Sequence, residues 1–206
     1  IKGSAFYSGA IGLENIKAID LMSVDEFKAK WGLDFSIKTM LVTVHPETIN
    51  PELNQQNVEA LKIALTILLK KMQILITMPN ADTLGSLYRE MFKELKSQHD
   101  QNLYLVENLG TQGYFSAMKL SSILFGNTSS GIIEAASFGK YVINIGNRQK
   151  GRAHGENVIH VPFKSEQLVA KTEAYFNQTY SGPNRYQNEG GIDLIIHTLK
   201  EKLNGL

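Results

Sequence analysis

The sequence predicts an α/β fold with a doubly wound, Rossmann-like parallel sheet, and two observations support this prediction. Short, largely apolar segments alternate about six times with segments in which apolar residues recur at helical spacing. Strands that are apolar along their whole length indicate burial on both faces, which a parallel sheet covered by helices provides. Ligands of such sheets bind at the carboxyl ends of the strands, so each strand exit is a candidate site.

The first half of the chain predicts a capped helix followed by alternating strands and helices. Ser23 stands three residues before Glu26, a spacing typical of a capping box, for a helix that ends near Lys30. The elements predicted next are strand 38–45, helix 52–70, strand 73–78, helix 83–98 and strand 102–107.

The second half continues the alternation. Its predicted elements are helix 111–119, strand 121–125, helix 130–138, strands 141–145 and 157–161, and helices 164–178 and 190–204. Residues 1–16, rich in Gly and Ser, are expected to form a linker or loop, which leaves residues 17–206 as one domain. Because the chain starts with Ile1 and not Met, we expect it to be part of a longer protein.

The composition is that of an ordinary globular protein and excludes several kinds of chemistry. Of the 206 residues 43% are hydrophobic and 20% are charged, and the net charge of +1 gives no reason to expect binding to nucleic acid or to a membrane surface. The chain has no cysteine, which excludes disulfides, zinc–thiolate sites and cysteine nucleophiles. No apolar run approaches the roughly 20 residues of a membrane helix. The first residues do not resemble a signal peptide, so a cytoplasmic protein is expected.

The strongest candidate site follows strand 121–125, where the sequence GNTSSG opens a helix. Backbone N–H groups at a helix start favour an anion, and the hydroxyls of Thr128, Ser129 and Ser130 can donate to its oxygens. Gly131 would let a phosphate approach the backbone closely. The alternative is that Ser129 or Ser130 only caps the helix.

Glu134 lies among apolar residues early in the same helix, where burial of a lone carboxylate is unfavourable. A carboxylate beside an anion site is suited to a ligand with hydroxyl groups, and a ribose diol fits that description. The alternative is a favourable interaction of Glu134 with the helix dipole.

Two other strand exits carry polar residues of the same kind. His45 ends strand 38–45 and could contact a phosphate or move a proton, although a structural role is the alternative. Glu47 could orient His45 or be solvated, and Asn80 and Asp82 follow the next strand in what could be an ordinary turn.

The loop after strand 141–145 contains three cations, Arg148, Lys150 and Arg152, which suggest either a phosphate lid or a solvated surface loop. All these strand exits fall on one edge of one sheet. Together, the anion cradle, the acid, the histidine and the basic loop predict a nucleoside diphosphate site.

The segments GNTSSGIIEAASFGKYVINIGNRQKGRAHGENVI at 126–159 and VTVHPET at 42–48 resemble the UDP-N-acetylglucosamine 2-epimerases of the hydrolysing type. The resemblance runs from about Ser8 to the C-terminal helices. It implies a GT-B fold of two Rossmann-like domains with the active site between them, of which this chain is the C-terminal, UDP-binding domain.

The resemblance also implies roles for single residues. Thr128 and Ser129 match positions that bind the diphosphate, and Arg148 matches an arginine that contacts phosphate. Glu134 matches the acid that holds the ribose hydroxyls, and His45 matches the histidine implicated in catalysis.

Two further positions match places where the family contacts the nucleotide. These are Asn80 and Leu109, the latter through its backbone at the uracil. The resemblance requires no metal or other cofactor, and the composition offers no obvious metal site. Family members commonly pair, so a homo-oligomer is one outcome that the resemblance allows.

The implied reaction converts UDP-N-acetylglucosamine, or a 2,4-diacetamido relative, and water to N-acetylmannosamine, or its relative, and UDP, as in sialic acid biosynthesis. It proceeds by elimination and then hydration. The carboxylates that move the C2 proton are expected in the N-terminal domain, which this chain does not contain, so the chain alone should bind UDP without turnover.

Three alternatives stay open from the sequence. A non-hydrolysing epimerase is less well matched by HPETIN and SSG. A GT-B glycosyltransferase would use the same hydroxyl cradle and ribose-binding acid, and a non-catalytic module would bind UDP only to sense it.

Overall fold

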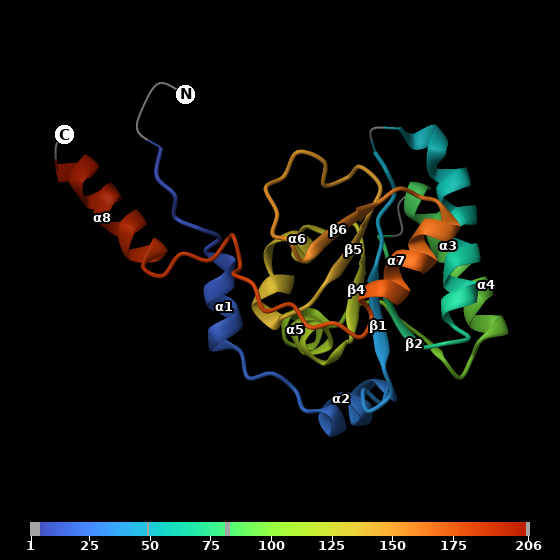
Figure 1. Ribbon diagram of the computed structural model, residues 1–206. Helices are drawn as coiled ribbons and strands as arrows, with labels where there is room; N and C mark the ends of the chain where they lie inside the picture. The colour runs from blue at the N-terminus through green and yellow to red at the C-terminus, as the bar shows by residue number, and fades with distance from the viewer. Residues whose placement is uncertain (1–4, 49, 81–82, 205–206) are drawn as a thin grey trace.

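The computed structural model describes residues 5–48, 50–80 and 83–204, and these residues form an open parallel sheet between two layers of helices (Figure 1). Every pairing between neighbouring strands is parallel, and the strand order is β3-β2-β1-β4-β5-β6. The strands are β1 Thr39–Thr43, β2 Gln73–Thr77, β3 Leu103–Val106, β4 Ile123–Gly126, β5 Val142–Ile145 and β6 Val158–Val161. The predicted fold class, a doubly wound Rossmann-like sheet, is therefore confirmed.

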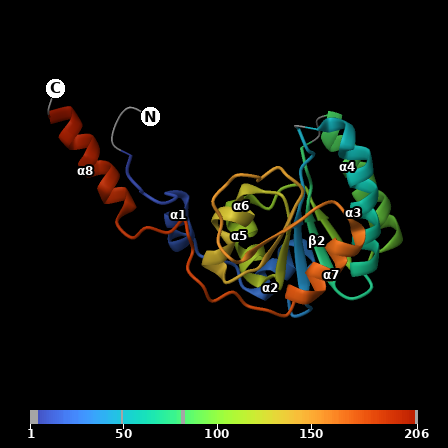
Figure 2. The same cartoon turned by 45° about the horizontal axis from the view of Figure 1, so that its top comes forward.

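Helices connect the strands and cover both faces of the sheet. They are α1 Gly12–Ala18, α2 Val24–Trp31, η1 Pro51–Leu53, α3 Asn54–Leu68, α4 Thr83–Gln98, α5 Gly110–Leu120, α6 Ser129–Ile133, η2 Ala135–Phe138, α7 Ser165–Tyr175 and α8 Gly191–Asn204. In both views α3, α4 and α7 lie on one side of the sheet, and α2, α5 and α6 lie on the other (Figures 1 and 2). Of the described helices, none is both long and apolar enough to cross a membrane.

The core divides into two layers because successive strand residues point to opposite faces. On β1, Met40 and Val42 pack toward α3, α4 and α7, whereas Leu41 packs toward α2 and α5. Helix α3 contributes the predicted stripe at helical spacing to the first layer, with its apolar side chains almost fully buried at Val58, Leu61, Leu65 and Leu68. This packing on both faces leaves only the edges of the sheet open to a ligand.

The strand order changes direction between β1 and β4, which are neighbours although they are far apart in the sequence. In open parallel sheets the crevice at such a switch point is where ligands bind, outside the carboxyl ends of the strands. The exits of β1 and β4 therefore lie where chemistry is expected.

Most predicted elements are present, and the capping box is confirmed. The N–H of Ser23 donates to Glu26 Oε2 at 2.7 Å, and the N–H of Glu26 donates to Ser23 Oγ at 3.2 Å. One expectation differs, because helix α1 begins at Gly12, inside the segment 1–16 expected to be a loop. The Gly and Ser content suggested a loop, but Leu13 is buried in the fold and gives this segment a reason to be helical.

The helix predicted at 130–138 is divided into α6 and η2. After Glu134 the backbone bonds tighten, since Ser137 N–H donates to Glu134 C=O and Gly139 N–H to Ala136 C=O. Gly139 then ends the turn in the left-handed region, with φ of 66°. The helix is short because the chain must turn back at once into β5.

Candidate functional site

The exits of β1, β4 and β5 surround a polar cavity of about 310 Å³ at the switch point of the sheet. Five of the predicted site residues line it together with Arg152 of the basic loop; the five are His45, Thr128, Ser129, Ser130 and Arg148. The remaining lining residues are Thr43, Tyr114 and Gln149. The structure thus brings the hydroxyl cluster, the histidine and two arginines to one place, as the sequence predicts.

The start of α6 is capped by Thr128 and not by either serine. Thr128 has an extended backbone, and its hydroxyl oxygen accepts the N–H of Gly131 at 3.2 Å. Ser129 is exposed, and Ser130 is partly buried beside it. Because α6 has only five residues, its dipole is small, and the hydroxyls and arginines must supply most of the recognition of an anion.

Two glycines shape this turn for reasons of packing. A Cβ on Gly126, whose φ is 151°, would lie 1.9 Å from the carbonyl oxygen of Thr43 on β1. A Cβ on Gly131 would lie 3.0 Å from Val142 of β5. Gly126 therefore lets β4 end close against β1, and Gly131 lets α6 pack on the sheet. The N–H of Gly131 is used by the cap, so its predicted contact with a ligand stays a prediction.

Asn127 joins three strand exits from a position with no solvent exposure. Its Oδ1 accepts the N–H of His45 at 2.7 Å, and its Nδ2 donates to the carbonyl of His45 at 2.8 Å. Its own carbonyl accepts from Nε2 of Gln149 at 2.8 Å. This side chain fixes the backbone of His45 beside the hydroxyl cluster, a role that sequence reasoning did not assign to it.

Glu47 and Arg148 connect the exits of β1 and β5. Glu47 is buried, which rules out the solvated alternative, and its Oε1 accepts the N–H of Asn147 at 2.9 Å. Nη1 of Arg148 donates to the carbonyl of Pro46 at 3.2 Å. Both contacts hold the basic loop next to the segment that carries His45.

Glu134 has a carboxylate oxygen without a partner inside the described part of the protein. Its Oε2 is buried and makes no hydrogen bond. Burial raises the pKa of Glu134 above its usual value, and the nearby Ser130 hydroxyl partly opposes this rise in pKa. An unsatisfied buried oxygen is unfavourable, so a donor from a ligand would stabilise it.

Tyr114 on α5 is a site residue that sequence reasoning missed. Its hydroxyl lies 3.5 Å from Thr43 Oγ1, and Tyr114 lines the cavity together with Thr128 and Ser130. Desolvation raises its pKa, so the phenol stays protonated at neutral pH. No local pattern marks this residue, because its role depends on how α5 packs against the strand exits.

A family model described as UDP-N-acetylglucosamine 2-epimerase matches residues 2–200. The chain belongs to this family. The similarity in sequence extends to curated proteins: polysialic acid biosynthesis protein P7 of Escherichia coli is 28% identical over 204 residues, which are 97% of this chain and 51% of that protein. The UDP-N,N'-diacetylbacillosamine 2-epimerase (hydrolyzing) of Legionella pneumophila is 33% identical over 173 residues, 84% of this chain and 45% of that protein.

The similarity to solved structures identifies the type of fold. The S. aureus MnaA–UDP co-structure superposes with a TM-score of 0.72 at 18% identity, covering 97% of this chain and 53% of that one. The parallel sheet of this epimerase domain, with its helices, is one half of a GT-B fold. The chain spans about half the length of the curated relatives that it matches.

Three of the residues assigned by resemblance, Asn80, Leu109 and Glu134, do not line the main cavity. Asn80 is exposed and lines a smaller neighbouring cavity of about 120 Å³, which His45 and Arg148 also line. The side chain of Leu109 is buried in the core at the start of α5, so only its backbone is open to the predicted role. Asp82 lies outside the described residues, and Lys150 is exposed but does not line the main cavity.

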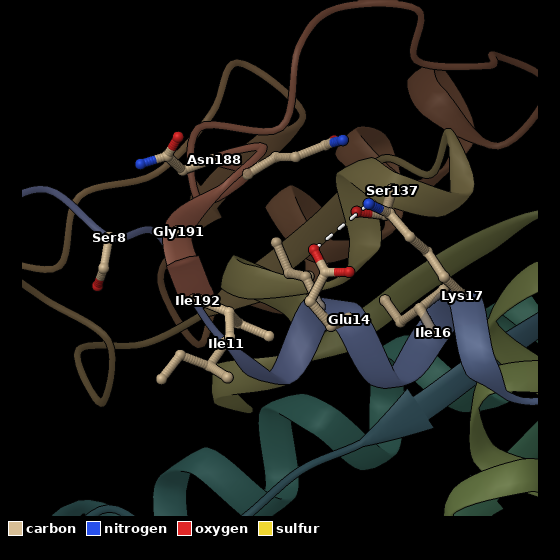
Figure 3. A pocket seen from close by; sticks show the side chains of 12 residues that line it. Ser8, Ile11, Glu14, Ile16, Lys17, Ser137, Asn188, Gly191 and Ile192 are labelled. Atoms are coloured by element: carbon tan, nitrogen blue, oxygen red, sulfur yellow. Dashed lines mark hydrogen bonds and ion pairs between the residues drawn. The ribbon is translucent and has the colours of Figure 1, made fainter. Parts of the chain in front are cut away.

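A separate cavity of about 190 Å³ lies between α1 and the start of α8 and has a different character (Figure 3). Apolar side chains of Ile11, Ile16 and Ile192 line it beside the ion pair of Lys17 and Glu14, whose Nζ and Oε1 are 3.3 Å apart. It contains none of the residues predicted for the site. Within the described part of the chain, no cluster of three or more His, Asp or Glu side chains could hold a metal ion.

Proposed function

We propose that this chain is the nucleotide-binding half of a hydrolysing UDP-N-acetylglucosamine 2-epimerase, and that the cavity at the switch point holds UDP. The observation that carries the proposal is the convergence of His45, the hydroxyl cluster and two arginines on that cavity. Glu134, which has a buried oxygen without a partner, follows at the end of the same short helix α6. Family membership supports the same reading.

The diphosphate binds to the hydroxyls and cations of the cavity. Thr128, Ser129 and Ser130 donate to phosphoryl oxygens, and Arg148 and Arg152 supply positive charge on the facing side. Arginine suits this position because its planar fork matches the geometry of a phosphate.

The nucleoside binds next to the diphosphate. Glu134 accepts hydrogen bonds from the ribose hydroxyls through its unpartnered Oε2. Asn80 and the backbone at Leu109 contact the nucleotide, as the resemblance implies.

In the proposed reaction, the first step breaks the C2–H bond and the bond from C1 to UDP, and a C1–C2 double bond forms. The negative charge that develops on the departing UDP is stabilised by Arg148, Arg152 and the hydroxyls, and His45 is placed to give or hold a proton near the leaving oxygen. Water then adds its hydroxyl at C1 and a proton at C2, which yields the 2-epimer.

The carboxylates that remove and return the C2 proton belong to the other half of the protein. The chain alone therefore binds UDP and does not turn over substrate. We place the protein in the cytoplasm, where it acts on a UDP-N-acetylhexosamine.

The test is a product analysis of the full-length protein with UDP-N-acetylglucosamine and its 2,4-diacetamido relative, without any acceptor. The proposal predicts free UDP and the free 2-epimer of one sugar, both followed by NMR, and no product from the 206-residue chain alone. A glycosyltransferase would need an acceptor, a non-hydrolysing epimerase would leave the sugar on UDP, and a sensing module would form no product, so each of these results would contradict the proposal.

A further inference from the structure

The basic loop between β5 and β6 is held by one buried side chain. The structure describes all of residues 147–156, and of these only Gln149 is buried, with 5% of its surface exposed. The loop carries Arg148 and Arg152, which line the main cavity although both are exposed. Because exposed side chains give a loop little support, the placement of these arginines depends on how Gln149 is held.

The side-chain amide of Gln149 is bound to the segment that leads into the hydroxyl cluster. Its Nε2 donates to the carbonyl of Asn127 at 2.8 Å, and Asn127 directly precedes Thr128. Turning the amide by 180° would bring two oxygens together, so this bond fixes its orientation. Its Oε1 is then left buried without a partner. The amide thus combines one good hydrogen bond with one unfavourable atom, and its net contribution to stability should be small.

The backbone of Gln149 supports Arg152. The N–H of Arg152 donates to the carbonyl of Gln149 at 3.2 Å, which closes a turn between these two residues. Arg148 has a separate contact, since its Nη1 donates to the carbonyl of Pro46 at 3.2 Å. The hydrogen bond from Gln149 to Asn127 therefore sets where Arg152 lies relative to the hydroxyl cluster.

We propose that Gln149 is a positioning residue, which holds the basic loop against Asn127 so that Arg152 and the hydroxyl cluster face the same diphosphate. This inference rests on the proposed function, because it takes the diphosphate of UDP as the ligand. An arginine that is held in place beforehand loses less freedom when it binds a phosphate, so the affinity is higher.

The test measures the affinity of the 206-residue chain for UDP by calorimetry, with urea unfolding recorded for every variant. Gln149→Met keeps the length of the side chain and removes both polar atoms of the amide. The affinity for UDP is expected to fall about tenfold. The urea midpoint should change little, because methionine also removes the unpartnered oxygen. Gln149→Leu, an apolar replacement of different shape, is measured in parallel and should behave in the same way.

Gln178→Met is the matched control. Nε2 of Gln178 also donates to a backbone carbonyl, that of Ala174 at 2.7 Å, but Gln178 is exposed and does not line the main cavity. This variant removes a hydrogen bond of the same kind and should leave the affinity for UDP unchanged.

A double-mutant cycle separates positioning of Arg152 from general packing. In the background of Arg152→Ala, Gln149→Met should lower the affinity for UDP by no more than about twofold, because the residue that it positions has lost its charge. In the background of Ser129→Ala the loss should stay about tenfold, since that hydroxyl binds the diphosphate independently. A residue needed only for packing would weaken binding equally in both backgrounds.

The outcomes distinguish this inference from the proposed function. If the unsubstituted chain does not bind UDP, the proposed function of the cavity fails and this inference fails with it. If Ser129→Ala weakens binding and Gln149→Met does not, or if its loss is equal in both backgrounds, only the role of Gln149 is overturned. Failure of both Gln149 variants to fold would also overturn it, because the amide would then be needed for stability.

Discussion

At the scale of single residues, the buried side-chain amide of Asn127 fixes the backbone of His45, a residue far away in the sequence. It pairs with both the N–H and the carbonyl of His45, so the amide's donor and its acceptor are both needed. The sequence marks Asn127 only as part of a small polar cluster, because its partner lies 82 positions away.

Asn127→Asp should destabilise the chain in a way that depends on pH. The new carboxylate would face the carbonyl of His45, so its pKa would rise in the folded state above the ordinary value of about 3.9. The free energy of unfolding should then fall as pH rises above about 4, with a loss of roughly 3 kcal/mol at pH 8. Urea unfolding at pH 5 and pH 8 measures this loss of stability. Asn102→Asp, at an exposed position, is the control. Equal losses at both pH values in Asn127→Asp would contradict the account.

Glu134→Gln should stabilise the ligand-free chain while it weakens nucleotide binding. The pKa of Glu134 is raised by burial, so ionised Glu134 opposes folding, and the free energy of unfolding falls as pH rises from about 4.5 through the folded pKa. The neutral amide removes this fall, for a gain of about 1 kcal/mol or less at pH 7. Thermal unfolding from pH 4 to pH 8 gives the measurement, and a variant less stable than the parent at pH 7 would show that the carboxylate has a structural partner.

At the scale of elements, the end of β4 depends on a residue without a side chain. Gly126→Ala would bring a Cβ against the Thr43 carbonyl and should cost roughly 3 kcal/mol or more, because backbone atoms cannot move aside. Gly151→Ala is a suitable control, since Gly151 also has positive φ, 84°, but has open space around the position of its Cβ. Gly151→Ala should lower the free energy of unfolding by only about 1 kcal/mol. If chemical denaturation gave equal losses for the two variants, crowding against β1 would not be the cause.

Helix α8 extends away from the two layers in both overall views (Figures 1 and 2). Its side chains at Ile192, Ile196 and Leu199 are between 40% and 56% exposed, so they add little to the core. A chain that ends at Gly190 should keep the thermal midpoint within a few degrees and the affinity for UDP unchanged. A large drop in either quantity, measured by calorimetry, would show that α8 supports the sheet.

At the scale of the whole molecule, the sequence is enough to predict the architecture and the region of the site. Buried strands and amphipathic helices have distinct periods, and parallel strand exits must share one edge, so the sequence pattern alone places His45, Thr128 and Arg148 together. Their individual contacts with a ligand stay predictions.

What the sequence does not show depends on contacts between distant segments. Three such contacts join segments that are far apart in the chain. They are the hydrogen bonds of Asn127 to His45, the hydrogen bond of Glu47 to the basic loop, and the contact of Tyr114 with Thr43. The helix at α1 is missed because its local composition signals a loop, whereas burial of Leu13 decides its structure.

The central claim is that the cavity at the switch point of the sheet binds a nucleoside diphosphate, and titration of the chain with UDP tests it most directly. The account predicts binding by the unsubstituted chain and a loss of roughly tenfold or more in Ser129→Ala and Arg148→Ala, with no loss in Ser181→Ala, an exposed serine outside the cavity. UDP binding that neither substitution in the cavity weakens would contradict the account, because the nucleotide would then lie elsewhere on the molecule.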